Sequence, residues 1–262
     1  MAIIPECAWL TTHLVRFSKE LRADDLDLSH HPAGAIRWKF GPDSPIGHDG
    51  FRTRISPVWC GVGFYQERAA ADAALDDPVA HLPFLPTATE SWHALLAPIS
   101  HFGEANCLDL ANPGRFVHPA SDPGGLFVVL TTAGFDLEPN VDLERIKDFI
   151  SNVERIREWM GAAEGLFFRQ VFKPAGDPAE DGFTISVWRD EGSMMNFAYR
   201  QGIHREQLDR YKALRTADRA SFTRCRAVRT AGSWGGVDPA QGENLRAAQP
   251  SSQAIGRVSA ST

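Results

Sequence analysis

The residues with the clearest chemical potential lie on one stripe of a predicted helix. Phe197, Gln201, His204, Leu208 and Tyr211 fall at i, i+4, i+7, i+11 and i+14, a spacing that places them on one helix face. An imidazole on such an apolar face can be an axial ligand of haem iron, with its neighbours holding the porphyrin. The alternative is an ordinary histidine of the core or of the half-exposed surface, and the stripe alone leaves both open.

Positive charge gathers around this histidine. Residues 200–229 carry nine basic and three acidic side chains, a local charge of +6 in a chain of net charge −6. Arg200 and Arg205 flank His204 and could pair with the two haem propionates. A solvated helix face with i,i+4 ion pairs is the simpler explanation of the same charges. The pattern favours a small anionic ligand over nucleic acid, because non-specific nucleic-acid binding needs an overall excess of positive charge.

Other chemistry-bearing residues lack a recognisable pattern. A group of His and Asp residues has no metal-ligand spacing and is typical of a solvated loop: Asp25, Asp27, His30, His31, His48 and Asp49. Gly61-Val62-Gly63 lacks the third glycine of a dinucleotide-binding fingerprint. The cysteines are scattered without a C-x-x-C pair, which argues against a disulfide scaffold or a cysteine zinc site: Cys7, Cys60, Cys107 and Cys225.

Composition indicates an ordinary globular protein. Of the 262 residues, 43% are hydrophobic and 23% are charged. No uncharged apolar run approaches the ~18–20 residues that cross a bilayer, so we expect no transmembrane segment. The first ten residues lack the basic start of a signal peptide. We therefore expect a cytoplasmic protein.

The elements that must position the stripe are clearest in the second half of the chain. Apolar β-branched and aromatic runs predict strands at 126–132, 166–172, 183–188 and 221–228. Helical spacing of apolar residues predicts a helix from about 142 to Met160, and a long helix from Asp190 to Leu214. The order is β-α-β-β-α-β, the split βαβ arrangement of ferredoxin-like folds.

The first half repeats this order more faintly. Strands are predicted at 8–17, 35–40, 58–65 and 92–100, with a short helical stretch after the first and an Ala-rich helix at 67–75. The predicted fold class is therefore α+β, with tandem ferredoxin-like units forming a dimeric-type α+β barrel. We expect an N-terminal unit at 1–117, a C-terminal unit at 118–239 with the candidate ligand helix, and a disordered tail at 240–262.

The segment from Arg200 to Pro239 resembles the C-terminal region of the spheroidene monooxygenase family, which oxidises carotenoids. The resembling residues are Arg200, Gly202 and His204, an Arg-rich final strand, and the ending Gly232-Ser233-Trp234-Gly235-Gly236-Val237-Asp238-Pro239. Residues 35–41, with Gly50-Phe51, resemble an upstream segment of the family. The resemblance implies a dimeric-type α+β barrel and a haem-containing, O₂-dependent oxygenase. His204 then matches the proximal ligand, whereas we interpret the Trp234–Pro239 loop as structural.

These features together predict a haem-dependent monooxygenase acting on a hydrophobic or secondary-metabolite substrate. The cofactor-contacting residues are predicted to be His204, Arg200, Arg205, Phe197, Leu208 and Tyr211, with His204 as the metal ligand. Electrons would come from a separate ferredoxin or reductase, since no flavin or nicotinamide motif is visible. A homodimer is compatible with this fold class. The alternatives are a haem-dependent dehydratase of the aldoxime dehydratase type, a haem-binding protein without turnover, and a cofactor-independent monooxygenase of the antibiotic-biosynthesis type.

Overall fold

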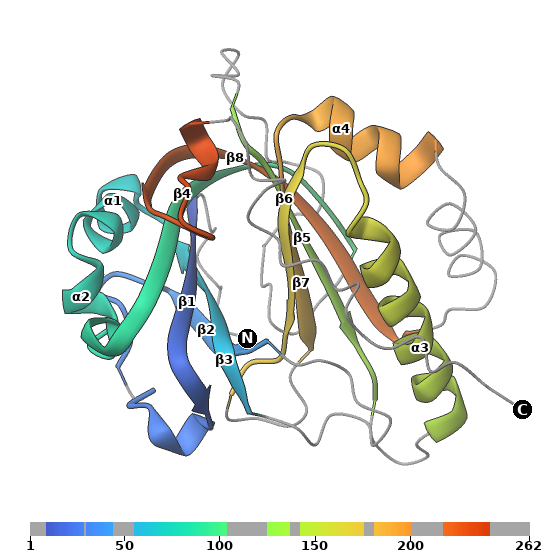
Figure 1. Ribbon diagram of the computed structural model, residues 1–262, viewed down its shortest axis with the longest axis horizontal. Helices are drawn as coiled ribbons and strands as arrows, with labels where there is room; N and C mark the ends of the chain where they lie inside the picture. The colour runs from blue at the N-terminus through green and yellow to red at the C-terminus, as the bar shows by residue number, and fades with distance from the viewer. Residues whose placement is uncertain are drawn as a thin grey trace, which may run out of the picture.

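Eight strands dominate the part of the chain that the structure describes, a computed structural model of residues 9–28, 30–43, 55–103, 125–136, 142–175, 181–200 and 217–241 (Figure 1). The first half contributes β1 (Trp9–Leu21), β2 (Arg37–Pro42), β3 (Ser56–Tyr65) and β4 (Ala88–Gly103). The second half contributes β5 (Phe127–Gly134), β6 (Leu166–Phe172), β7 (Gly182–Trp188) and β8 (Arg219–Gly232).

The strands form one antiparallel sheet in the order β2-β3-β1-β4-β8-β5-β7-β6. Within each half the order is that of a ferredoxin-like unit, in which the last strand lies beside the first and the third separates the first from the second. The two units join at the centre, where β4 pairs with β8. The predicted α+β class with tandem ferredoxin-like units is therefore confirmed.

The sheet curls until its two edge strands approach each other. A bridge joins Asp43, at the end of β2, to Phe172 of β6, and the amide of Ala175 donates to the carbonyl oxygen of Phe40 at 2.8 Å. The Asp43 carboxylate also accepts from the amide of Val171 at 3.3 Å. These contacts close a barrel. Buried side chains from both halves fill its interior, among them Leu14, Trp92, Leu130, Phe172 and Ile185.

Helices cover the outer face of each half of the sheet. The first half carries α1 (Arg68–Asp76), α2 (Pro78–His81) and the short 3₁₀ turns η1 (Ala23–Asp25) and η2 (Leu85–Thr87). The second half carries α3 (Leu143–Met160) and α4 (Glu191–Met195), which continues as the π-helix η3 (Asn196–Arg200). Figure 1 shows the two groups of helices on opposite sides of the barrel. A last 3₁₀ turn, η4, spans Pro239–Gln241.

The glycine-rich turn after β8 closes one end of the barrel. Trp234 is 7% exposed and joins the interior core, and the Arg16 guanidinium lies 4.6 Å from its ring centroid. Gly235 and Gly236 have φ values of +66° and +77°, which let the chain turn back so that Trp234 donates its amide to the carbonyl oxygen of Val237 at 2.8 Å. The structural interpretation of this loop agrees with these contacts.

The predicted strands all occur, and β6 has the predicted bounds. Most ends of the other strands differ from the prediction by one to four residues. β4 and β8 are longer than predicted at both ends, because they pair with each other along most of their length. The predicted helix from Asp190 begins as expected, but residues 201–216 lie outside the described part of the chain, as do residues 242–262 of the predicted tail. The division into domains at 117/118 stays a prediction, since that point is not described.

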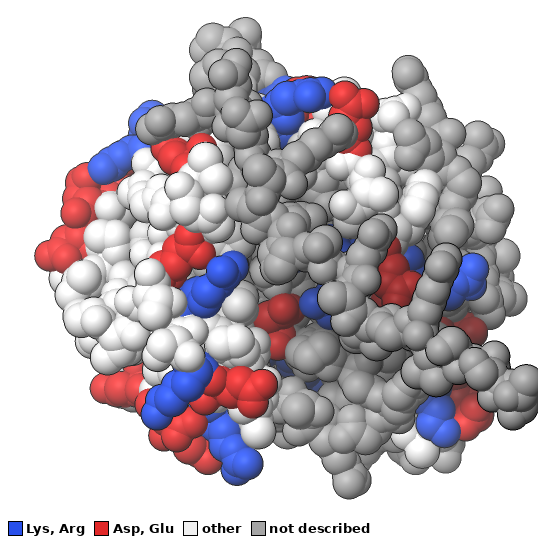
Figure 2. Space-filling view, in the orientation of Figure 1, with Lys and Arg blue, Asp and Glu red and all other residues white. Residues whose placement is uncertain are grey.

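No helix among the described residues is long and apolar enough to span a membrane. On the face shown in Figure 2, basic and acidic side chains are interspersed over the N-terminal half and form no single-sign patch among the described residues.

Candidate functional site

Strand register defines the outer face of the C-terminal half of the sheet. Cross-strand pairing places Phe127 beside Arg226, Val129 beside Arg224, and Thr131 beside Phe222. On the other side of β8, Arg224 is opposite Ser100 and Phe222 is opposite Phe102. Opposed residues of a sheet point to the same face, and the alternate residues of β8, such as Cys225, enter the barrel interior. We call the surface of Ile99, Phe102, Val129, Phe222 and Arg224 the β4–β8 face.

Two helices cover the part of the sheet next to the β4–β8 face. Phe197 of the π-helix is 4% exposed, and its ring centroid lies 4.6 Å from that of Trp159 and 5.4 Å from that of Trp188. Met160 and Met194 complete this cluster, and Ile99 and Val129 pack against it. Phe197, predicted to contact a cofactor, therefore lies in a packed core that borders the face.

The β4–β8 face itself carries exposed apolar surface. Phe102 is 73% exposed and Tyr199, near the end of the π-helix, is 43% exposed. Phe102 pairs with Phe222 on the sheet and Tyr199 contacts Arg224, so these aromatic side chains border one surface. Contiguous exposed apolar surface is typical of a binding site. The π-helix also ends directly before the segment that contains His204, and π-turns within helices often mark functional sites.

Most of the predicted site residues lie outside the described part of the chain. This holds for His204, Arg205, Leu208 and Tyr211, and for the side chain of Arg200, whose backbone ends the π-helix. Their roles stay predictions. The structure brings together Phe197, the β4–β8 face and two arginines of β8, Arg224 and Arg226. Sequence analysis included these arginines only as members of the basic stretch at 200–229.

These two arginines differ in their partners. The Arg226 guanidinium is 3.3 Å from the Glu191 carboxylate of α4 and 4.8 Å from the centroid of the Phe127 ring. The Arg224 Nη2 atom donates to the Tyr199 hydroxyl at 2.8 Å. Arg226 thus helps to hold α4 on the sheet, whereas Arg224 has no carboxylate partner among the described residues.

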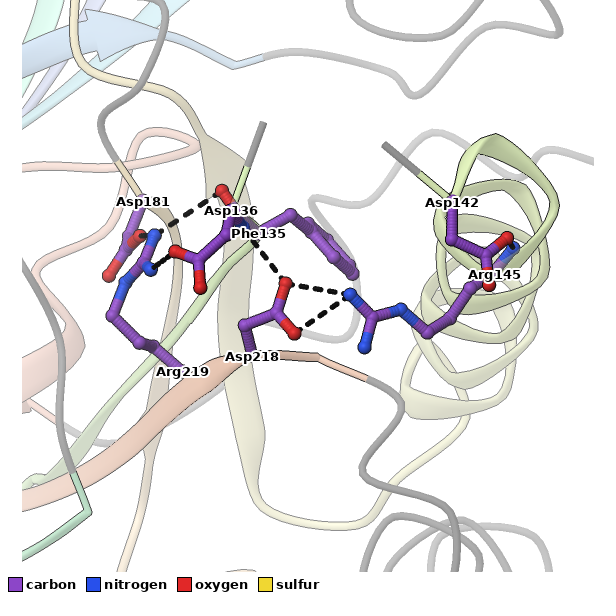
Figure 3. A network of polar contacts seen from close by, with 7 residues as sticks. All are labelled: Phe135, Asp136, Asp142, Arg145, Asp181, Asp218 and Arg219. Carbon is purple, nitrogen blue, oxygen red and sulfur yellow. Dashed lines mark hydrogen bonds and ion pairs between the residues drawn. The ribbon is translucent and has the colours of Figure 1, made fainter. Parts of the chain in front are cut away.

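A polar network fixes the point at which the chain enters β8 (Figure 3). Arg219 forms ion pairs with Asp136 and with Asp181, the latter at 3.1 Å. Arg145 of α3 binds both oxygens of Asp218 at 2.7 and 2.8 Å. The network joins α3, β5, β7 and β8 at the end of the sheet where the chain returns after His204.

A second cluster of chemistry-bearing residues lies on the outer face of the N-terminal half, and sequence analysis did not identify it. His13 of β1 and His93 of β4 are opposite each other, 0% and 3% exposed, with their Nδ1 atoms 2.9 Å apart. The Nε2 atom of His13 is 2.8 Å from Thr11 Oγ1, and the Nε2 atom of His93 is 3.0 Å from Ser91 Oγ. Each histidine thus forms a hydrogen bond with the hydroxyl group of the residue two places earlier on its own strand.

Burial keeps this histidine pair neutral. It lowers the pKa of His93 to about 4 and lowers the pKa of His13 well below its ordinary value, with His93 and His81 adding to the effect on His13. One imidazole must donate its Nδ1 proton to the other, because two protonated Nδ1 atoms at 2.9 Å would repel. The only signal in the sequence is the repeated pattern of a hydroxyl residue two places before a histidine, and the pairing of β1 with β4 is needed to bring the two copies together.

A cavity of about 360 Å³ opens where β8 separates from β5 at one end of the barrel. Apolar residues and two arginines line it, including Leu126, Phe167, Val228, Arg189 and Arg229. Both arginines already have acidic partners, Asp190 for Arg189 and the α1 aspartates Asp72 and Asp76 for Arg229. The cavity therefore offers little uncompensated positive charge.

Part of what a haem site needs is present among the described residues. The β4–β8 face supplies apolar surface for a porphyrin ring and a guanidinium for its carboxylates. It has no histidine among the described residues, because His101 turns into the barrel and bonds Thr223 Oγ1 at 2.8 Å. No cluster of three metal-ligating side chains occurs in the described ranges. The face therefore offers a porphyrin apolar contacts and one cation, and a ligand for its iron would have to come from elsewhere, as predicted for His204.

Comparisons with known proteins identify the fold. A domain family of unknown function, DUF3291, matches residues 132–221, a range that includes α3, α4 and His204. No curated protein sequence matches the chain significantly. An aldoxime dehydratase structure aligns with 84% of this chain and 82% of its own, at 10% identity and a TM-score of 0.54. An aldoxime dehydratase in complex with butyraldoxime aligns with 84% of this chain and 80% of its own, also at 10% identity and a TM-score of 0.54. The chain shares their ferredoxin-like α+β-barrel fold, and the resemblance to the spheroidene monooxygenase family stays a prediction.

Proposed function

We propose that this protein is a haem-dependent oxygenase that inserts oxygen into a hydrophobic small molecule, with the haem on the β4–β8 face and His204 as the axial ligand. The observation that supports this most directly is the exposed apolar surface of that face, at the end of the π-helix that leads to His204. A flat, apolar cofactor would remove Phe102 and Tyr199 from water.

The haem, when bound, supplies the oxidative chemistry at its iron. The residues of the chain bind and orient it. Phe102, Phe222 and Val129 would exclude water from the bound ring, and His204 would hold its iron. The packed cluster around Phe197 keeps the helix that leads to His204 in place. Electrons for O₂ activation would come from a separate ferredoxin or reductase.

An absorption spectrum tests this proposal. Protein expressed with added haem precursor should show a Soret band, and His204→Ala should lose it, whereas the control His31→Ala at an exposed position should keep it. Imidazole added to His204→Ala should restore the band, which separates a lost ligand from a lost fold. Wild-type protein that stays colourless would refute the haem assignment and favour the cofactor-independent alternative.

Product analysis with ¹⁸O₂ separates the haem-dependent alternatives. An oxygenase transfers label from O₂ to its product, and a dehydratase of the aldoxime type incorporates none. A coloured protein that turns over neither class of substrate would be a haem-binding protein without catalysis.

A further inference from the structure

We propose that Arg224 and Tyr199 form a carboxylate-binding element on the β4–β8 face, which selects flat apolar ligands that carry an acid group. This inference rests on the proposed function only for the identity of the ligand, which would be a haem with a propionate as its acid group. It assigns anion recognition to the sheet, in addition to the helix residues Arg200 and Arg205 that the sequence suggested.

The first argument is the state of the Arg224 side chain. Its Nη2 atom donates to the Tyr199 hydroxyl at 2.8 Å, and its guanidinium carbon lies 5.9 Å from the centroid of the Tyr199 ring. Tyrosine holds the guanidinium in place without neutralising it. Because a guanidinium has five N–H donors, most remain for a ligand.

The second argument is the contrast with the neighbouring arginines of β8. Arg226 pairs with Glu191, Arg219 pairs with Asp136 and Asp181, and Arg229 pairs with two aspartates of α1. Within the described part of β8, Arg224 is the arginine whose positive charge is not balanced by a carboxylate. It is therefore the residue of this strand best able to attract an anion from outside the chain.

The third argument is the surface around this charge. Val129 and Ser100 flank Arg224 across the sheet, and the Phe222–Phe102 pair lies two residues earlier on β8. An acid group bound by Arg224 would leave the apolar part of its molecule on these phenyl rings. Arginine suits this task because its planar fork binds a carboxylate through two parallel hydrogen bonds.

Metal-free protoporphyrin IX and its dimethyl ester provide the main test, because neither needs an axial ligand and the fluorescence of both reports binding. We expect wild-type protein to bind the acid about tenfold more tightly than the ester, the factor of a single charge-assisted carboxylate contact. Arg224→Gln should lose most of this preference, with an unchanged affinity for the ester, since only a contribution from Arg200 and Arg205 would remain. The preference of Tyr199→Phe for the acid should lie between those of wild type and Arg224→Gln. Arg68→Gln, which removes an exposed arginine of α1, is the matched control and should behave as wild type.

A second ligand pair separates failure of this inference from failure of the haem assignment. Anthracene-9-carboxylate and its neutral amide carry the same flat body without a porphyrin. If the protein prefers this acid through Arg224 but binds no porphyrin, the carboxylate element stands and the haem assignment is refuted. Three results would overturn the inference. They are equal affinities of wild type for acid and neutral forms in both pairs, no binding of either pair, and a preference for the acid that is as large in Arg224→Gln as in wild type.

Discussion

The buried pair His13–His93 makes a quantitative prediction about acid stability. In the unfolded chain each imidazole has a pKa near 6.5, whereas in the folded protein the pKa of His93 is about 4 and that of His13 is also well lowered. The stability that the neutral pair contributes is therefore present above about pH 6.5 and is lost as the pH falls toward 4, since only the unfolded chain takes up the protons.

The size of the effect follows from these pKa values. Between about pH 7.5 and about pH 5, protonation of His93 in the unfolded chain should lower the free energy of unfolding by about 2 kcal/mol, and His13 should add to this loss in the same direction. That is a large fraction of the stability of an ordinary domain. The double variant His13→Gln/His93→Gln should lose this pH dependence even if its stability at neutral pH is lower.

Urea unfolding, followed by tryptophan fluorescence at several pH values, measures the effect. The quantity compared is the slope of unfolding free energy against pH, which should be shallower in the double variant than in wild type and unchanged in the exposed control His31→Gln. If the double variant unfolds too easily, ¹⁵N NMR of the imidazoles in wild type provides the same information. Equal slopes in wild type and double variant, or imidazole signals that titrate near pH 6.5, would refute the reasoning.

Three further outcomes are expected from urea unfolding. Arg219→Ala should destabilise the protein by about 3 kcal/mol, because Asp181 is 1% exposed and would lose the ion pair at 3.1 Å; wild-type stability in this variant would contradict the network. Burial raises the pKa of Asp43 to about 6, so the free energy of unfolding of the wild-type protein should fall by about 1 kcal/mol between about pH 5 and pH 7, as Asp43 ionises in the folded protein. Asp43→Asn should remove this fall; an unchanged slope of unfolding free energy against pH would contradict the reasoning. Trp234→Ala should lower the free energy of unfolding by about 3 kcal/mol, because it removes from the barrel core a side chain that is only 7% exposed. A decrease below about 1 kcal/mol would mean that the turn does not close the barrel.

The architecture could be predicted from the sequence because its signals are local. Apolar runs such as Leu166–Phe172 and the helical spacing up to Met160 specify strands and a helix without knowledge of their partners. The order of these elements then indicates ferredoxin-like units, and the structure confirms it. The predicted ends of the strands are less accurate, because β4 and β8 extend as far as they pair with each other.

The chemistry of the two outer faces depends on partners that are far apart in the chain. His13 and His93 meet only because β1 and β4 pair in one register. Arg224 differs from Arg226 in its partner, which is Tyr199 of the π-helix η3 for Arg224 and Glu191 of α4 for Arg226. Sequence periodicity says which face of an element a residue occupies, but it does not say which residue lies opposite. The resemblance that identified His204 adds a role for one residue without describing its surroundings.

The central pairing of β4 with β8 has a consequence for dissecting the protein. Eleven residue pairs join these strands, and β4 is sixteen residues long, so either half expressed alone would present a long unpaired strand edge to solvent. Such an edge recruits another strand. An isolated half should therefore either self-associate, with a copy of itself in place of the missing unit, or aggregate. The fused chain supplies each half with its partner strand at high effective concentration and protects the edge as soon as both halves fold.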